Sequence, residues 1–292
     1  MFKRLFSVLA ATTLFSQFSH ADAMVWKVSN DQGELYLGGT LHMLRESDYP
    51  LNSEYTQAFN NSDIIVFETD INAAMDMGFQ QQLMMQMSLP PGKTLESSLQ
   101  PATFARLKQF CEARNIPIDT MKTFKPAMAI LMMTQIELQK IGVQNNSGIE
   151  NYFSTLATSA KKSIASLETP DEQIAMLTSL GEGYEDDYVN GSLDDLDNVE
   201  KEFTQLIKAW KNADLAMINA KMIQVMKDRF PEVYNNLLVK RNLNWLKHID
   251  QMIKTPEKEF ILVGAAHLVG DDSVQNLLRK QGYKVEKFNL KK

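Results

Sequence analysis

One short pattern occurs near both ends of this 292-residue chain and constrains its fold more than any other feature. Residues 34–44 (ELYLGGTLHML) align without a gap with residues 259–269 (EFILVGAAHLV). Each copy is an apolar run of strand length that ends in Gly-x-x-His, and such runs predict buried strands. We therefore expect His42 and His267 at the points where two strands leave their sheet.

Two further strand-like segments, residues 63–69 and 162–169, both end in Glu-Thr. Their acidic residues are Glu68 and Glu168. The carboxyl ends of parallel strands share one edge of a sheet, and ligands bind in the crevice at that edge. If all four strands belong to one parallel sheet, two imidazoles and two carboxylates converge there.

The remaining patterns predict an α/β fold, α+β by content. Residues 24–37 indicate a hairpin, whereas residues 71–147 and 172–254 show mainly helical periodicity, with an acidic loop at 182–197. We expect a small, mostly parallel sheet formed by both termini as a pseudo-repeat, with large helical insertions. Because the two halves need each other's strands, residues 22–292 are expected to form a single domain.

The first 21 residues are typical of a secretory signal peptide. Lys3 and Arg4 precede an apolar stretch that is followed by small residues. The stretch is shorter than the roughly 20 residues of a membrane-spanning helix. We therefore expect a periplasmic or secreted protein with no integral membrane segment after cleavage.

The charge and cysteine content exclude some classes of function. The formal net charge is −6, and cleavage would remove two positive charges and no negative ones. An acidic protein has no general attraction for nucleic acid or anionic lipid surfaces. The single cysteine, Cys111, cannot form an internal disulfide and is expected to be a buried apolar residue in a helix.

The paired Gly-x-x-His segments carry the candidate chemistry. Gly39 and Gly264 remove a side chain where a ligand or a neighbouring backbone comes close. Two imidazoles with one or two carboxylates form a ligand set that suits Zn, Mn, Co or Fe(II). Zn with an open position makes bound water nucleophilic, and a carboxylate that is not a ligand can act as general base.

Each of these residues also has a structural interpretation. A histidine on an apolar segment can be a core residue bonded to the backbone, and the two glutamates can cap helices or pair with a buried Arg241. The default placement of the Arg241-Asn242 pair is the surface of an amphipathic helix. A Gln-rich helix carries methionines that could bind Cu(I), pack flexibly or cover a site: Met75, Met77, Met84, Met85 and Met87.

Several segments together resemble the TraB/GumN family in order and spacing. They cover nearly all of the chain after the signal: Tyr36–His42, Phe67–Asp70, Gly148–Glu150, Leu167–Thr169 with Gln173, Arg241-Asn242 with Trp245, and Val263–Gly270. That family is related to the animal Tiki proteins, which are regarded as metal-dependent proteases active with Mn or Co. It is more distantly related to erythromycin-esterase-like and ChaN-like proteins.

The resemblance implies a metallohydrolase in which His42 and His267 are the two motif histidines and Glu68 is the strand-end acid. Glu168 and Arg241 would be further polar members of the pocket. One departure is Glu150, where the family pattern more often has Asp. We expect Glu150, Arg241 and the two motif glycines to support the ligands from behind.

Three hypotheses follow. The leading one is an exported metal-dependent hydrolase, a peptidase acting on peptides or proteins, with His42, His267, Glu68 and Glu168 at a divalent Mn, Co or Zn ion. The second is a non-catalytic envelope protein that binds a metal, haem or a small ligand in the same place. The third is a structural protein of the envelope whose histidines bond within the core.

Overall fold

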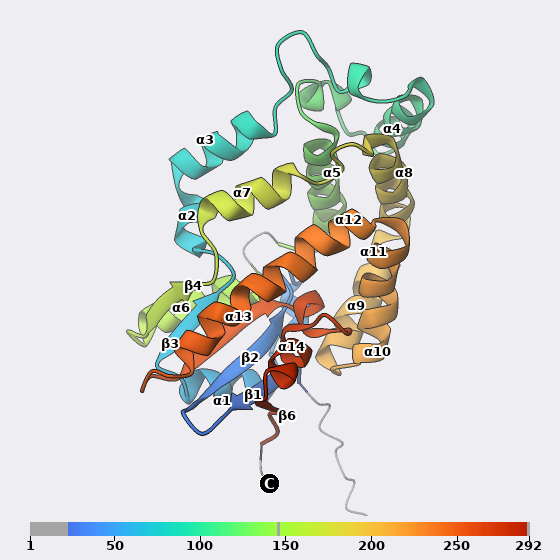
Figure 1. Ribbon diagram of the computed structural model, residues 1–292. Helices are drawn as coiled ribbons and strands as arrows, with labels where there is room; N and C mark the ends of the chain where they lie inside the picture. Colours follow the sequence, from blue (N-terminus) through green and yellow to red (C-terminus); the bar gives the residue numbers. More distant parts are fainter. Residues whose placement is uncertain (1–22, 145–146, 291–292) are drawn as a thin grey trace, which may run out of the picture.

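The protein is built around a six-stranded sheet, shown in the computed structural model of Figure 1, which describes residues 23–144 and 147–290. The strand order is β4-β3-β5-β2-β1-β6. The first four strands in this order are mutually parallel, whereas β1 is antiparallel to both β2 and β6. The strands are β1 (Val25–Ser29), β2 (Glu34–Thr40), β3 (Ile64–Phe67), β4 (Ser163–Ser166), β5 (Glu259–Gly264) and β6 (Lys284–Lys287).

This sheet confirms the predicted α/β class and the predicted hairpin of residues 24–37. The strand β5 is buried along its whole length, as its apolar sequence requires, because it lies between β2 and β3. The two Gly-x-x-His strands, β2 and β5, are therefore neighbours. Their carboxyl ends lie at the same edge as those of β3 and β4.

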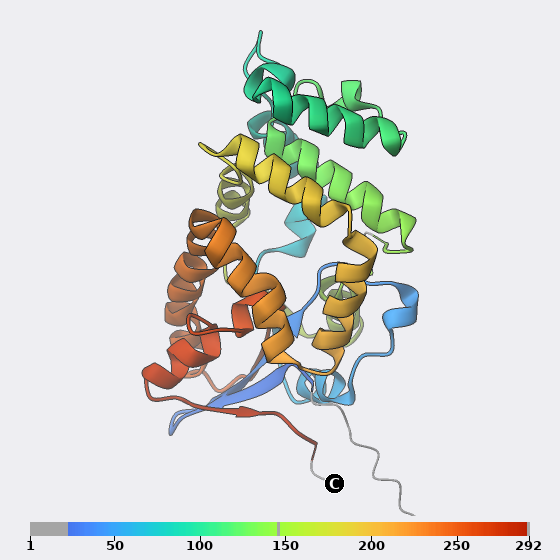
Figure 2. The same ribbon diagram turned by 90° about the vertical axis from the view of Figure 1, so that its right-hand side faces the viewer.

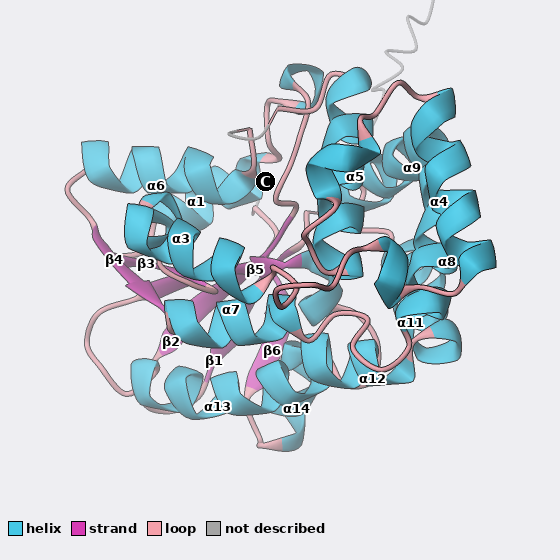
Figure 3. Ribbon diagram, turned by 90° about the horizontal axis from the view of Figure 1, so that it is seen from above, coloured by secondary structure: helices cyan, strands magenta, loops and turns pink. Residues whose placement is uncertain are grey.

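Helices cover both faces of the sheet. Seen from above in Figure 3, α1 and α6 lie on one face, and α13 and α14 lie on the other. The helices are α1 (Ser53–Asn60), α2 (Ile71–Met75), α3 (Met77–Gln86), α4 (Pro101–Ala113), α5 (Pro126–Lys140), α6 (Ile149–Ser159), α7 (Pro170–Thr178), α8 (Glu185–Leu196), α9 (Val199–Lys211), α10 (Leu215–Ile218), α11 (Gln224–Arg229), α12 (Pro231–Tyr234), α13 (Lys240–Met252) and α14 (Val274–Lys280).

The predicted helical insertions form a second layer beyond the sheet. Figure 2 shows α4 and α5 stacked above it. Together with α8 they enclose a separate apolar cluster, which includes Cys111, buried in α4 as predicted. In the described part of the chain, no helix has the length and apolar character needed to cross a membrane. The predicted signal peptide, residues 1–21, lies outside the described residues.

The prediction of an acidic loop at residues 182–197 is wrong, because most of this segment forms helix α8. Its first turn is acidic, which favours a helix amino terminus. Its inner face is apolar, and two of its aspartates pair with arginines: Asp194 Oδ1 lies 2.6 Å from Arg106 Nη2, and Asp195 Oδ1 lies 3.3 Å from Arg229 Nη1. The buried residues of the inner face are Val189, Leu193 and Leu196.

The methionine-rich helix α3 is largely exposed. Met77 and Met85 are 84% and 70% exposed, so these two side chains do not pack into the core. Met87, at the end of the helix, is fully buried. The side chain of Met75 lies outside the described part of the molecule. Copper binding by these methionines stays a prediction.

Candidate active site

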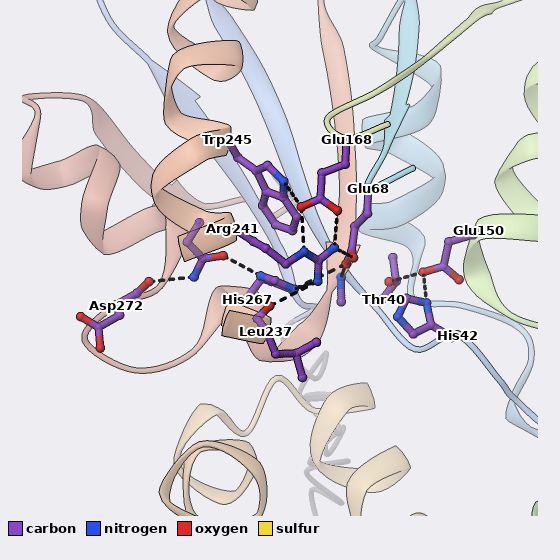
Figure 4. A network of polar contacts seen from close by, with 12 residues as sticks. Thr40, His42, Glu68, Glu150, Glu168, Leu237, Arg241, Trp245, His267 and Asp272 are labelled. Atoms are coloured by element: carbon purple, nitrogen blue, oxygen red, sulfur yellow. Dashed lines mark hydrogen bonds and ion pairs between the residues drawn. The ribbon is translucent and has the colours of Figure 1, made fainter. Parts of the chain in front are cut away.

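The ends of four parallel strands deliver the predicted polar residues to one edge of the sheet. Glu68 and Glu168 directly follow the β3 and β4 regions, and the Glu168 backbone amide donates to the Glu68 carbonyl at 2.8 Å. The strand predicted over 259–266 ends at Gly264, and a single 3₁₀ turn, Ala265–Leu268, then carries His267. The close-up in Figure 4 shows the resulting network.

His267 is held in one orientation by Asn242. The imidazole is 4% exposed, and its Nδ1 lies 2.6 Å from the Asn242 Oδ1. The amide is assigned this way round because its Nδ2 then donates to the Asp272 carbonyl at 2.8 Å. Nδ1 therefore carries the proton, and Nε2 keeps its lone pair. Burial lowers the pKa of His267 to about 3, so the ring is neutral.

His42 is held in the same way, but by a carboxylate. Its Nδ1 lies 2.9 Å from Glu150 Oε1, which also accepts a hydrogen bond from the Thr40 hydroxyl. The His42 side chain is 64% exposed, so solvent reaches it. The negative charge of Glu150 raises the pKa of His42. As at His267, the orienting partner occupies Nδ1 and leaves Nε2 facing the site.

Gly148 explains how Glu150 reaches His42. A Cβ at this position would collide with the His42 carbonyl, so only glycine lets the start of α6 approach this closely. The amide of Ile149 donates to the Leu41 carbonyl at 3.3 Å and fixes the docking. The helix then presents Glu150 in its first turn, where its negative charge is favoured.

Arg241 lies at the centre of the network. Its Nε and Nη2 donate to the two oxygens of Glu168 at 2.7 and 2.8 Å, and Nη2 also donates to Glu68 Oε2 at 2.5 Å. Its Nη1 donates to His267 Nε2 at 3.1 Å and to the Leu237 carbonyl at 3.3 Å. All five N–H groups of the guanidinium are thereby used.

The surrounding residues stabilise this ion cluster. Trp245 donates its indole N–H to Glu168 Oε1 at 2.8 Å, and its ring lies 4.4 Å from that of His267. Burial raises the pKa of Glu68, but the positive charges of Arg241 and His42 and the hydrogen bond from the Gly264 amide outweigh this effect, and the pKa falls to about 2. Glu68 is therefore ionised at neutral pH.

Gly264 lies among the three predicted ligands, which approach the position that a side chain would occupy. Its amide donates to Glu68 Oε1 at 2.6 Å. A Cβ on this residue would lie 3.2 Å from Glu68 Oε1, 3.6 Å from His267 Cδ2 and 3.7 Å from His42 Nε2. His267 Nε2 is itself 3.8 Å from Glu68 Oε1. The two imidazoles and the carboxylate thus surround one point.

The donor chemistry of this point suits a divalent cation, since it combines two oriented imidazoles with an ionised carboxylate. Across residues 23–144 and 147–290, however, no group of three His, Cys, Asp or Glu residues is arranged to hold a metal ion. The Arg241 guanidinium lies among these side chains and donates to the His267 Nε2 and to one oxygen of Glu68.

Most predicted site residues lie in this network, and one does not. The surroundings of Gly39 are apolar: a Cβ there would meet Met24 and the Ala265 Cα, and its carbonyl accepts from Trp210 Nε1 at 2.8 Å. The residues that the structure places in the network are His42, Glu68, Glu150, Glu168, Arg241, Gly264 and His267.

The default surface placement of Arg241 and Asn242 is wrong, because they are only 8% and 1% exposed. The role of Asn242 in holding His267 was missed for this reason. A signal was present in the sequence, since the buried residues of α13 recur at helical spacing and the pair lies on that same face. These buried residues are Arg241, Asn242, Trp245, Leu246 and Ile249.

Two imidazoles, three carboxylates and a buried arginine thus form a polar candidate site at the strand ends of an α/β sheet. The model of the TraB/PrgY/gumN family matches residues 24–287, and the chain belongs to this family. This confirms the resemblance to TraB/GumN proteins. No solved structure matches the chain.

Three relatives show the range of similar proteins. The chain is 25% identical over 248 residues to YbaP of Escherichia coli (strain K12), covering 84% of this chain and 87% of YbaP. It is 23% identical over 322 residues to Metalloprotease TIKI1 of Danio rerio, covering 92% of this chain. A Metalloprotease TIKI homolog of Nematostella vectensis is 25% identical over 306 residues, covering 86% of this chain. The matches span 63% and 64% of these two longer relatives.

Proposed function

We propose that this chain is an exported, metal-dependent hydrolase that cleaves peptide bonds, with His42, His267 and Glu68 at its reaction centre. One observation carries the proposal. Each histidine has its Nδ1 fixed by an acceptor, Glu150 or Asn242, and the two rings meet the Glu68 carboxylate around Gly264. Relatives named metalloproteases support the reaction class. The signal-like residues 1–21 support a periplasmic or secreted location.

The proposed function assigns a separate role to each residue of the site. His42, His267 and Glu68 would hold a divalent cation, Mn, Co or Zn, which when bound supplies Lewis acidity toward water and the bond to be cleaved. Asn242 and Glu150 orient the two rings. Glu168 was a fourth ligand in the sequence-based hypothesis; with both oxygens accepting from Arg241, we propose that it anchors the guanidinium instead.

A substrate would approach from the side of His42, because this ring is exposed whereas His267 is buried. His42 Nε2 faces Gly264, so the reacting group of a bound peptide would reach a cation held by this nitrogen from the same exposed side. The acidic character of the centre suits a cation and a neutral peptide group better than an anionic substrate.

The test compares hydrolysis and metal content in matched histidine variants. Purified protein is treated with EDTA, reloaded with Mn, Co or Zn, and incubated with a peptide library that is analysed by mass spectrometry. We expect cleavage that needs added metal and disappears in the His42→Ala, His267→Ala double variant. His248→Ala, on the exposed face of α13, is the control and should cleave normally.

Cleavage by a folded double variant at the wild-type rate would refute the proposal. Stoichiometric binding of a metal or haem with no cleavage of any peptide would instead favour the non-catalytic binding protein. A double variant that loses stability, in a protein that binds neither metal nor haem, would favour the structural interpretation of the histidines.

A further inference from the structure

The guanidinium of Arg241 bonds the same atoms that a metal would need. Its Nη1 donates a hydrogen bond to the lone pair of His267 Nε2 at 3.1 Å, and its Nη2 donates one to Glu68 Oε2 at 2.5 Å. His267 Nε2 is the only nitrogen of that ring with a lone pair available for a metal. Glu68 Oε2 is one of the two oxygens of its carboxylate. A hydrogen bond from Arg241 and coordination to a metal cannot share the Nε2 lone pair, because it is a single electron pair.

The carboxylates of the cluster carry more negative charge than the single positive charge of Arg241 compensates. Glu68, Glu150 and Glu168 contribute three negative charges. In the metal-free protein His42 is protonated, because Glu150 raises its pKa to about 9, but it must lose this proton to bind a metal. Arg241 then contributes the one positive charge among these network residues. The side chains of Glu68, Glu150 and Glu168 are only 13%, 16% and 8% exposed. Uncompensated charge is costly in such surroundings. A second cation is therefore favoured at this place, and a divalent one would balance the excess.

Arg241 keeps its ion pair with Glu168 when its hydrogen bonds to the two proposed ligands, His267 and Glu68, break. Its Nε and Nη2 form a two-pronged contact with Glu168, which Trp245 also holds through its indole N–H. This paired geometry is the strongest arrangement that an arginine makes with a carboxylate. Only the contacts on the other side of the guanidinium, to His267 and Glu68, have to break.

We propose that Arg241 and a divalent cation compete for His267 and Glu68, so that the chain takes up metal only when Arg241 withdraws onto Glu168. This inference rests on the proposed function, since it assumes that His42, His267 and Glu68 are the ligands. Arg241 is then an internal cation that partly compensates the carboxylates of the metal-free site and sets the affinity of this site for metal.

The test measures the affinity for Mn²⁺, Co²⁺ and Zn²⁺ by calorimetry on metal-free protein. Arg241→Met removes the competitor, and we expect the affinity to rise at least about tenfold, because hydrogen bonds from a charged donor no longer have to break. Arg241→Lys keeps the charge but cannot bond three partners as the planar fork does, so we expect tighter binding here as well. Arg106→Met, which removes an arginine paired with Asp194, should bind as the wild type does.

The lysine variant separates competition from simple charge repulsion, because the net charge does not change. Equal or weaker binding in both Arg241→Met and Arg241→Lys would overturn the inference while leaving the proposed function intact. Absence of metal binding in the wild type and in all variants would overturn the proposed function, and the inference with it. If Arg241→Met does not fold, the double variant Arg241→Met, Glu168→Gln removes the ion pair as a unit and is expected to show the same gain; no gain there also counts against competition.

Discussion

The two glycines of the repeated motif offer a sharp test of the site, because they have opposite surroundings. Gly264 lies against His42, Glu68 and His267, whereas Gly39 lies against core residues. The change to alanine adds one methyl group in each case. We expect Gly264→Ala to impair metal binding and peptide cleavage with little effect on stability, and Gly39→Ala to do the reverse.

The expected magnitudes come from the contacts. The backbone of Gly264 has φ −50° and ψ 137°, which alanine adopts without strain. Replacing glycine at such a position stabilises by about 0.4–1 kcal/mol through the unfolded chain. The new methyl would sit 3.2 Å from Glu68 Oε1, which opposes that gain. The net change should stay within about 1 kcal/mol, or roughly 2–4 °C in Tm.

Binding should respond more strongly. The methyl would also lie 3.7 Å from His42 Nε2, so it would occupy the space between two proposed ligands that must each approach a cation to about 2 Å. We expect a loss of metal affinity of about tenfold or more, which is about 1.4 kcal/mol. In Gly39→Ala the methyl would meet Met24 at 3.2 Å, and crowding of the core should cost about 1–3 kcal/mol.

The assay combines calorimetric titration with Mn²⁺, Co²⁺ or Zn²⁺, peptide cleavage and thermal unfolding of both variants. The reasoning is refuted if folded Gly264→Ala binds metal and cleaves peptides as well as the wild type does. It is equally refuted if Gly39→Ala loses binding more severely than Gly264→Ala at a temperature where both are folded.

Three further changes have expected outcomes. Glu150→Gln removes the charge that raises the pKa of His42, so the pKa should fall from about 9 towards 6.5 in an NMR titration of metal-free protein; an unchanged value would contradict the pairing. Burial raises the pKa of Glu259 from 4.5 to about 7, so the folded state favours the protonated form and loses stability as the pH rises through this range. Glu259→Gln should therefore add roughly 1–3 kcal/mol at pH 8 and almost nothing at pH 4 in urea unfolding, and an equal effect at both pH values would argue against it. Trp210→Phe removes the 2.8 Å bond to the Gly39 carbonyl and should cost about 1–2 kcal/mol in the same assay, whereas no loss would mean that this bond adds nothing.

Much of the fold was predictable because each parallel strand has a recognisable apolar pattern in its own short stretch of sequence. The apolar runs before His42, Glu68, Glu168 and His267 have strand length and end in polar residues, and all four belong to the parallel part of one sheet. Local pattern does not encode which strands pair. The position of β5 between β2 and β3 depends on packing across more than two hundred residues, so the order of strands could not be predicted.

The candidate site was predictable where a residue ends a strand and less so where it lies on a helix. Arg241 was predicted as a supporting member of the pocket through the family resemblance, whereas the helical pattern alone favoured the surface, because a charged residue on an amphipathic helix is usually solvated. The partnership of Asn242 with His267 joins a helix to a turn 25 residues away, and no short-range pattern specifies it. Helix α8 was predicted as a loop because of its acidic composition, although its apolar residues recur at helical spacing.

The central position of β5 also has a consequence for the order in which the molecule can assemble. The strands β2 and β3 are synthesised early, yet the strand that joins them begins only at residue 259. Until then both have an unpaired edge, which is a hazard for aggregation during synthesis. His42 and Glu68 are brought together only when β5 pairs with both strands, so all of residues 41–258 must emerge before the candidate site can form. A partly made chain therefore lacks this site, and the same late strand completes both the sheet and its cluster of polar side chains.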